Sequence, residues 1–451
     1  MYKTKLILSR LWTMLLITCL SVTYSVAQIW PDSTWETDSA EVQGMSTEKL
    51  QAYIDWLDGK ASAEPYGTII IRSGKIVAEY YGGGATASSK WEIGSLRKAV
   101  GSTLLGMALD DSIIALDDIV YDIWPAIDKG KSRDKRIKVK HLFNSTSGWM
   151  QGDEPGSKWV YCNACFTASG EVVGAAFEAD NNKIAPLAEE KIGDAIGALN
   201  WHAYHYDDPF SGAYSNPGPK LAVDSDMRDL ARFGYLWLRK GNWNGKQLVP
   251  EWYIEEASHN TVSHLGKHYG YCWFVNDNKV LLPDAPNDVF FHIGNGTGNR
   301  RTVLLIIPSQ DIVAAVGVKS DAWDINKDYK SEPVPNVNEW ISQIMPSILS
   351  DPVAIHKSNH NVVKKQEIQI LNVSSISSSV LSVQLSMAKK QNVNIIVSDV
   401  SGKIYSTTSG ILEKGMQRKH ITLESPVSGI AVVTVITKKN IYKVKVPMLS
   451  H

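Results

Sequence analysis

Two groups of strand-like segments lie about 190 residues apart in the sequence, and this separation constrains the fold most strongly. The first group is a hairpin, in which residues 68–72 and 75–81 flank the turn signal Ser73-Gly74. Residues 116–245 show helical patterns and polar loops but no convincing pair of strands. The second group has four apolar segments, at 271–276, 289–293, 302–307 and 312–318. The chain therefore predicts a sheet assembled from distant segments, with a helical insert at about 110–285.

The pattern changes after about residue 350. Residues 363–448 contain no Trp and are rich in Ser, Val, Ile and Lys, with period-2 runs at 393–397 and 430–435. Short strands at regular spacing are typical of a small β-sandwich. We therefore expect a first domain over residues 28–350, a linker over residues 351–365 and a β-sandwich over residues 366–451.

The first residues have the features of a secretory signal peptide. Lys3, Lys5 and Arg10 precede an apolar run over residues 11–22, and small residues follow at 25–27. Cleavage after Ala27 removes residues 1–27. We expect the mature protein to be secreted or exposed at the cell surface. No later apolar stretch approaches the length of a transmembrane helix, so we expect no transmembrane segment.

Composition excludes several classes of protein. The 46 Lys and Arg residues nearly balance the 47 Asp and Glu residues, and charged residues make up only 21% of the chain. Such a balance does not predict a basic face, so nucleic acid is not an expected partner. The chain contains 15 Trp and 18 Tyr residues, which is ample for a large packed core and excludes general disorder.

The most informative short motif is Ser95-Leu96-Arg97-Lys98, at the start of a helix predicted for residues 95–107. A serine hydroxyl is a weak nucleophile near neutral pH and needs a base within hydrogen-bonding reach. Residues i and i+3 share a helix face, so the Lys98 amine is expected beside the Ser95 hydroxyl. Lys98 accepts a proton only when it is neutral, which requires burial or a nearby cation. By itself the motif is common, and a capping serine with an exposed lysine remains the alternative.

Further segments follow this motif in a fixed order. They are His141-Leu142-Phe143-Asn144, the segment 155–163 that contains Tyr161-Cys162-Asn163, the helical segment 226–234 and Phe291-His292-Ile293-Gly294. Together with the Ser95 motif, they give the stretch 67–318 a resemblance to serine hydrolases related to class C β-lactamases. That group includes penicillin-binding esterases, D-aminopeptidases and nylon-oligomer hydrolases. The resemblance implies an α/β (α+β) fold of the β-lactamase/transpeptidase type, with an antiparallel sheet flanked by helices.

The resemblance also assigns roles to individual residues. Ser95 resembles the acylated nucleophile, Lys98 its proton partner, and Tyr161 the tyrosine that relays a proton to the leaving group. We expect the nearby lysine cation to lower the pKa of the Tyr161 phenol. Asn163 completes the Tyr-x-Asn element. The oxyanion would bind to the backbone N–H groups of Ser95 and Asn295.

Two features of this assignment leave alternatives open. Tyr214-Ser215-Asn216 is also a Tyr-x-Asn sequence, but Tyr161 is preferred because it leads into a helix predicted at 168–178. His292-Ile293-Gly294 stands where β-lactamases have a Lys-Thr-Gly strand, so a mostly neutral ring replaces an ammonium group. This replacement favours small esters or amides over substrates with a carboxylate. A histidine that only satisfies a core hydrogen bond is the alternative.

After removal of the signal peptide three cysteines remain, which permits at most one disulfide and leaves one thiol. Cys162 and Cys165 have C-x-x-C spacing, but neither a thioredoxin context nor a second zinc-binding pair accompanies them. We interpret them as small residues of the core beside Tyr161. Which cysteines pair, if any, stays open. We expect no metal and no cofactor.

The C-terminal segment resembles the sorting domains of type IX secretion, which carry proteins across the outer membrane of Bacteroidetes-type bacteria. The resemblance depends on Asp399-Val400-Ser401-Gly402, Ser428-Gly429-Ile430 and the closing run 443–447. It implies the secretion machinery as a partner; a β-sandwich that binds carbohydrate or surfaces is the alternative. For the whole chain we expect an exported serine hydrolase of small esters or amides. The alternatives are a β-lactamase or D,D-carboxypeptidase, and a non-catalytic surface-binding protein.

Overall fold

The structure is a computed structural model. It describes residues 30–31, 34–111, 113–178, 184–206, 220–319, 321, 323–349, 368–377, 379–387, 389–399, 403–412, 415–425, 430–437 and 441–447. The chain divides into two compact units, Met1–Ile355 and His356–His451. The predicted signal peptide (1–27), the predicted linker (351–365) and Tyr214 lie outside the described residues.

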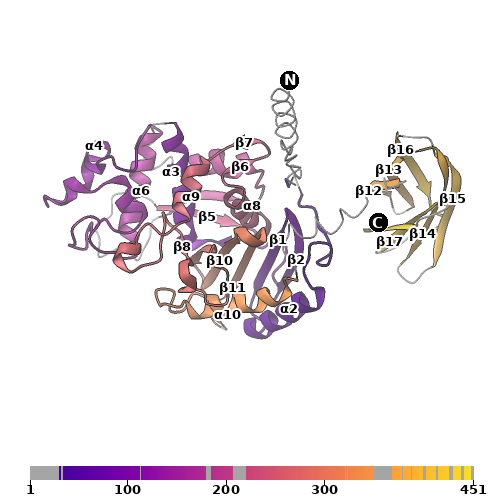
Figure 1. Cartoon of the computed structure of the whole chain (residues 1–451), viewed down its shortest axis with the longest axis horizontal. Helices are drawn as coiled ribbons and strands as arrows, with labels where there is room; N and C mark the ends of the chain where they lie inside the picture. Colours follow the sequence, from indigo (N-terminus) through magenta and orange to yellow (C-terminus); the bar gives the residue numbers. More distant parts are fainter. Residues whose placement is uncertain are drawn as a thin grey trace, which may run out of the picture. The chain divides into compact units, whose positions relative to one another are not determined.

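The first unit is built around a six-stranded antiparallel sheet with the order β2-β1-β11-β10-β9-β8. Its strands come from both ends of the unit, as the sequence predicted (Figure 1). They are β1 (Tyr66–Arg72), β2 (Lys75–Gly82), β8 (Phe274–Val275), β9 (Phe290–Asn295), β10 (Arg300–Ile307) and β11 (Ile312–Lys319). Ser73 and Gly74 have positive φ values of 50° and 79°, which suits the tight turn between β1 and β2.

Helices cover both faces of this sheet. Helices α2 (Thr47–Ala61) and α10 (Pro335–Ile344) pack on one face, and α8 (Met227–Leu238) packs on the other (Figure 1). The alternation of strand side chains explains this arrangement: Ile70 belongs to the core shared with α2 and α10, whereas Ile69 and Ile71 belong to the core shared with α8. The remaining helices are α3 (Arg97–Asp110), α4 (Val120–Ile123), α5 (Val139–Phe143), α6 (Asn163–Ala176), α7 (Ile184–Ala188) and α9 (Glu251–Ala257).

The insert is not purely helical, which corrects the expectation that residues 116–245 form no strand pairs. Strands β4 (His202–Tyr206) and β5 (Lys220–Ser225) pair with each other, and β5 also pairs with β3 (Trp91–Glu92). A short hairpin follows, made of β6 (Asn242–Trp243) and β7 (Lys246–Gln247). These strands are short and contain His, Asp and Lys, so their intrinsic preference for strand is weak and tertiary pairing decides their conformation.

The second unit is a β-sandwich. One sheet has the order β12-β13-β16 and the other the order β15-β14-β17-β18. Alternate residues of β13, β14 and β17 bury a common core, as the period-2 pattern predicted. The strands are β12 (Ile368–Ser377), β13 (Val380–Met387), β14 (Gln391–Asp399), β15 (Ile404–Leu412), β16 (Gly415–Thr422), β17 (Ile430–Ile436) and β18 (Ile441–Pro447). Among the residues that the structure describes, no helix is long and apolar enough to cross a membrane.

Candidate active site

Ser95 lies in a 3₁₀ turn over Gly94–Leu96, between β3 and α3. The helix was expected to open at Ser95, but α3 begins two residues later, at Arg97. Gly94 has a φ of +51°, and a Cβ atom at this position would lie 2.5 Å from the backbone nitrogen of Asn295. Only glycine fits here without strain. The turn that carries Ser95 therefore packs directly against the end of β9, where Asn295 lies.

Lys98 adopts the position that the i, i+3 spacing predicted. Its Nζ atom donates a hydrogen bond to the Ser95 Oγ atom at 3.1 Å and another to the Asn163 Oδ1 atom at 2.9 Å. Only 2% of the Lys98 side chain is exposed. The alternative of an exposed lysine beside a capping serine is therefore wrong. A buried amine in contact with a serine hydroxyl is an arrangement in which the amine can accept the serine proton.

Tyr161 and Asn163 approach this pair from the segment that leads into α6. The Lys98 Nζ atom lies 4.6 Å from the centroid of the Tyr161 ring, so the amine contacts the ring. Helix α6 begins at Asn163, five residues earlier than expected. The sequence motif therefore brings Tyr161, Asn163, Ser95 and Lys98 together at one place.

The pKa of Tyr161 shifts in the direction opposite to the one expected. Burial raises the pKa of the Tyr161 phenol, and the neighbouring Ser95 side chain opposes this rise only in part. Burial dominates because the phenolate would lose its hydration. The Tyr161 Oη atom has no hydrogen-bond partner of normal geometry within the described part of the chain. Tyr161 is thus a neutral phenol near neutral pH, suited to donating a proton.

His292 is fully buried in β9. Its Nδ1 atom lies 2.7 Å from the carbonyl oxygen of Ile293, and we assign this contact as an N–H donor bond. Burial lowers the pKa of His292 to about 3, and the charge of Lys98 lowers it further in the same direction. The ring is therefore neutral, as the sequence suggested, and it provides no positive charge for a substrate carboxylate.

The end of β9 is held by Asn326, which is not among the site residues predicted from the sequence. Asn326 Nδ2 donates to the Gly294 carbonyl oxygen and to the Asn295 Oδ1 atom, each at 2.8 Å. A Cβ atom at Gly294 would overlap the carbonyl oxygen of Ile93. Gly94 and Asn326 are consequently part of the site's framework. Asn326 follows a different strand, β11, and its role had no recognisable signal in the sequence.

Aromatic side chains line the side of the site that contains Tyr161. The rings in contact with Tyr161 are Trp159, Tyr269, Phe274, His292 and Tyr329. The exposed Lys330 adds a cation, with its Nζ atom 5.8 Å from the Tyr161 ring centroid. These contacts make the surroundings of the Tyr161 ring predominantly apolar.

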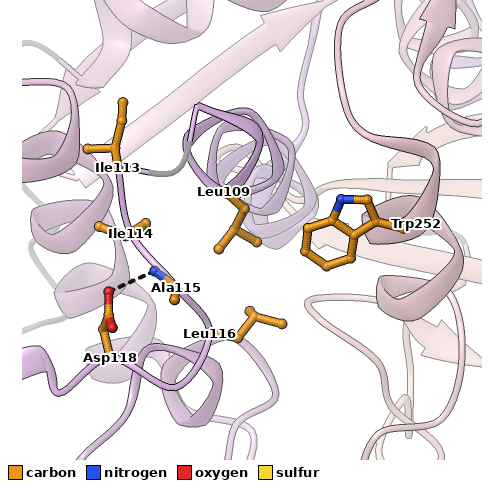
Figure 2. A pocket seen from close by; sticks show the side chains of 7 residues that line it. All are labelled: Leu109, Ile113, Ile114, Ala115, Leu116, Asp118 and Trp252. Carbon is orange, nitrogen blue, oxygen red and sulfur yellow. Dashed lines mark hydrogen bonds between the residues drawn. The ribbon is translucent and has the colours of Figure 1, made fainter.

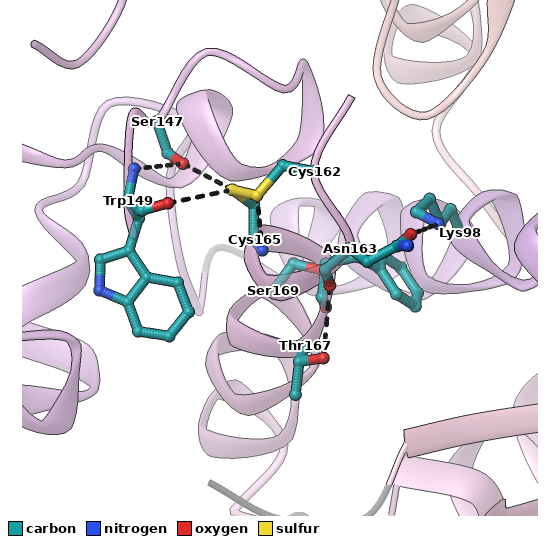
Figure 3. Close-up of a disulfide and its surroundings, with 9 residues drawn as sticks. Lys98, Ser147, Trp149, Cys162, Asn163, Cys165, Thr167 and Ser169 are labelled. Carbon is teal, nitrogen blue, oxygen red and sulfur yellow. Dashed lines mark hydrogen bonds between the residues drawn. A yellow bond between two sulfur atoms is a disulfide. The ribbon is translucent and has the colours of Figure 1, made fainter. Parts of the chain in front are cut away.

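Cys162 and Cys165 form a disulfide, which corrects their interpretation as simple core residues. Figure 3 shows the disulfide at the start of α6, with Asn163 reaching from the same turn to Lys98. Cys272 is a buried free thiol. One bridge and one remaining thiol are the outcome that the odd cysteine count allowed.

An apolar pocket of about 520 Å³ lies at the other end of α3 (Figure 2). Leu109 and Trp252 lie on opposite sides of it, and Ile113, Ile114 and Leu116 contribute to its wall. The only carboxylate drawn there, Asp118, accepts a hydrogen bond from the Ala115 backbone within a turn. The described residues that line this pocket therefore include no nucleophile. The side chains suited to catalysis lie together around Ser95 instead.

Comparison with known proteins places the chain in a family. The model of the beta-lactamase family matches residues 58–330, which is more than half of the chain. The protein therefore belongs to the beta-lactamase family. An uncharacterized protein of Alkalihalophilus pseudofirmus is 23% identical over 278 residues, covering 54% of this chain and 81% of the relative.

Solved structures share the fold of the first unit. A putative β-lactamase from Bacteroides dorei has a TM-score of 0.53 at 15% identity, covering 68% of this chain and 100% of its own. A putative 6-aminohexanoate-dimer hydrolase from Bacillus anthracis has a TM-score of 0.51 at 15% identity, with coverages of 74% and 91%. A β-lactamase/D-alanine carboxypeptidase from Pseudomonas syringae has a TM-score of 0.51 at 14% identity, with coverages of 66% and 98%. The chain thus has the β-lactamase/transpeptidase fold, with additional C-terminal strands.

Proposed function

We propose that this protein is a serine hydrolase that cleaves a small ester or amide through an acyl-enzyme on Ser95. The observation that carries the proposal is the 3.1 Å hydrogen bond between the buried Lys98 amine and the Ser95 hydroxyl. A serine becomes a useful nucleophile when a base is within hydrogen-bonding distance. Membership of a family that consists largely of serine hydrolases agrees with this proposal.

In the proposed mechanism, the Ser95 oxygen attacks the substrate carbonyl while its proton moves to neutral Lys98. The backbone N–H groups of Ser95 and Asn295 stabilise the oxyanion that forms. The phenol of Tyr161 donates its proton to the leaving group and regains one from Lys98. Water then attacks the acyl group, and the same groups return a proton to Ser95, which releases the acid product.

The substrate class follows from the surroundings of Ser95. The neutral His292 ring and the aromatic residues beside Tyr161 favour an uncharged, partly apolar ester or amide. The similarity to a putative 6-aminohexanoate-dimer hydrolase supports the same class.

One observation supports the second candidate, a β-lactamase or D,D-carboxypeptidase. Substrates of these enzymes carry a carboxylate near the reacting bond, and the exposed Lys330 ammonium, 5.8 Å from the Tyr161 ring, would attract it. The similarity in fold to a β-lactamase/D-alanine carboxypeptidase from Pseudomonas syringae agrees with this candidate.

Covalent labelling tests these assignments. The protein is treated separately with a fluorophosphonate and with a fluorescent penicillin, and the labelled peptide is mapped. We expect the fluorophosphonate to label Ser95, with no labelling of Ser95→Ala; penicillin turnover would favour the second candidate. If neither probe labels the protein and no ester is cleaved, a non-catalytic surface-binding role replaces the hydrolase proposal.

Export is a separate part of the proposal. The features of residues 1–27 suggest cleavage after Ala27, and the resemblance of residues 366–451 to type IX sorting domains suggests delivery across the outer membrane. The N-terminal sequence of the protein recovered from its native cells is then expected to begin at Gln28. A chain truncated after residue 350 is expected to stay in the periplasm; its release into the medium would contradict the sorting role.

A further inference from the structure

We propose that the Cys162–Cys165 disulfide is a positioning element for Tyr161 and Asn163, so that the hydrolase reaches its full rate only when these cysteines are oxidised. This inference depends on the proposed hydrolase function. It assigns a role to two residues that lie beside the reacting groups without taking part in the reaction.

The bridge lies next to two site residues in the chain. Tyr161 immediately precedes Cys162, and Asn163 lies inside the ring that the disulfide closes. Asn163 is the second hydrogen-bond acceptor of the Lys98 amine, at 2.9 Å. The bridge therefore restrains the backbone of Tyr161 and of Asn163, both of which contact Lys98. Figure 3 shows the contact of Asn163 with Lys98 beside the disulfide.

The backbone on both sides of Tyr161 is held in place. Before Tyr161, the Val160 N–H donates to the Ser145 carbonyl oxygen at 2.9 Å. After Tyr161, the Cys162 Sγ atom caps α6 by accepting from the Cys165 N–H at 3.0 Å. Tyr161 is thus fixed between a backbone hydrogen bond and a covalent turn. Because the Tyr161 hydroxyl has no normal hydrogen bond in the described structure, its position depends on packing and on this backbone.

A disulfide of this kind acts mainly on the local structure around it. A disulfide that links residues three apart closes a very short loop, and the entropy that it removes from the unfolded chain grows with loop length. Its contribution to global stability is therefore smaller than that of a long-range bridge, and its main effect is local. Small displacements of catalytic groups lower rates strongly, on the order of 10²-fold for about 1 Å.

The bridge is protected in the folded protein. Cys162 is 5% exposed and Cys165 is 1% exposed, and the Ser147 Oγ atom donates to the Cys165 Sγ atom at 3.0 Å. Thiol–disulfide exchange requires a thiolate, and burial raises the pKa of the Cys272 thiol to about 12. Cys272 therefore does not exchange with the Cys162–Cys165 bridge. Reduction requires an external dithiol, which gives two electrons and two protons to the bridge and becomes a cyclic disulfide.

Two double variants test the proposal. Cys162→Ser with Cys165→Ala removes the bond and keeps a side chain that can cap α6, whereas Cys162→Ala with Cys165→Ala removes both. We expect each variant to lower kcat for a neutral ester about tenfold or more, with KM within about twofold of the parent. Circular dichroism and the melting temperature report whether the fold is retained. If the bridge had a merely structural role, its removal would lower stability without the selective fall in kcat at nearly constant KM.

Chemical reduction gives an independent measurement. Dithiothreitol is expected to lower the kcat of the parent in step with the appearance of two thiols, and reoxidation is expected to restore it. The variant Cys272→Ser is the matched control and is expected to keep the parent's activity and its sensitivity to reduction. Both double variants should be insensitive to dithiothreitol.

Several outcomes would overturn the proposal. They are parental kcat in both double variants, recovery of kcat by the serine-capped variant alone, or loss of the fold in both variants. Failure of the proposed function is distinguishable, because the oxidised parent would then neither react with a fluorophosphonate nor cleave the ester.

Discussion

The backbones of Gly94 and Asn295 lie in direct contact, although 200 residues separate them in the chain. Gly94 precedes Ser95, and Asn295 ends β9. The contact therefore fixes the distance between the two N–H groups that the proposed mechanism assigns to the oxyanion. It also links the start of α3 to the central sheet, so the site depends on a close approach that only small residues permit.

Substitution of Gly94 by Ala tests this contact. The added Cβ atom would meet the Asn295 backbone in a left-handed conformation that is strained for alanine. We expect ester hydrolysis to fall by about 10²-fold and stability to fall by about 1–3 kcal/mol. Gly84→Ala is the matched control, because Gly84 also has a positive φ but has open space around it. Equal activity in both variants would contradict the role of the contact.

The role of Lys98 is tested with two substitutions. Lys98→Met removes the amine, and Lys98→Arg keeps a positive charge that does not dissociate at usable pH. If Lys98 accepts the Ser95 proton, both variants should lose about 10²–10⁴-fold in the rate of Ser95 acylation. The exposed Lys90, substituted by Met, serves as the control. An active Arg variant would mean that only the charge of Lys98 matters.

The two tyrosine candidates are separated by removal of each hydroxyl. Tyr161→Phe keeps the ring that contacts Lys98 and removes the proposed proton relay, so kcat is expected to fall by about 10²-fold or more. Tyr214→Phe is expected to stay within about twofold of the parent. Steady-state kinetics on one neutral ester measures both. The reverse pattern would transfer the role to Tyr214.

The buried His292 predicts a dependence of stability on acid. Its folded pKa of about 3 lies below the ordinary value near 6.5, so the unfolded chain binds the proton more readily between these values. The neutral His292 therefore stabilises the fold above about pH 6.5, and this contribution is lost as the pH falls. Between pH 7 and pH 5 we expect the free energy of unfolding to fall about 2 kcal/mol more for the parent than for His292→Gln.

Urea unfolding at the two pH values measures this difference. The exposed His264, substituted by Gln, is the control and should behave like the parent. The same loss of stability in the parent and in His292→Gln would show that another group causes the acid sensitivity.

The charge of Lys330 distinguishes the two substrate classes. If substrates carry a carboxylate, Lys330→Ala should raise KM for an anionic ester about tenfold and leave a neutral ester of the same size unchanged. Lys327→Ala, in the same exposed segment, is the control. No change for either ester would favour an uncharged substrate and weaken the β-lactamase or carboxypeptidase candidate.

Features that depend on neighbours along the chain could be predicted from the amino-acid sequence. The spacing of Ser95 and Lys98 predicted the contact between the amine and the hydroxyl, because the two residues are one helical turn apart. The turn signal at Ser73-Gly74 predicted the hairpin of β1 and β2, and the period-2 runs predicted the core of the sandwich. The order of motifs led to the family that the comparison found.

Features that depend on burial and on distant contacts became visible only in the folded protein. The pairing of β4 with β5 overrode weak strand preferences, and Asn326 reached β9 from another segment. The pKa of Tyr161 rose instead of falling, because desolvation of the phenolate exceeded the lowering by the Ser95 side chain and by the charge of Arg97. Sequence spacing specifies which groups are near one another along the chain, whereas the folded surroundings set how much water each group loses and therefore its charge.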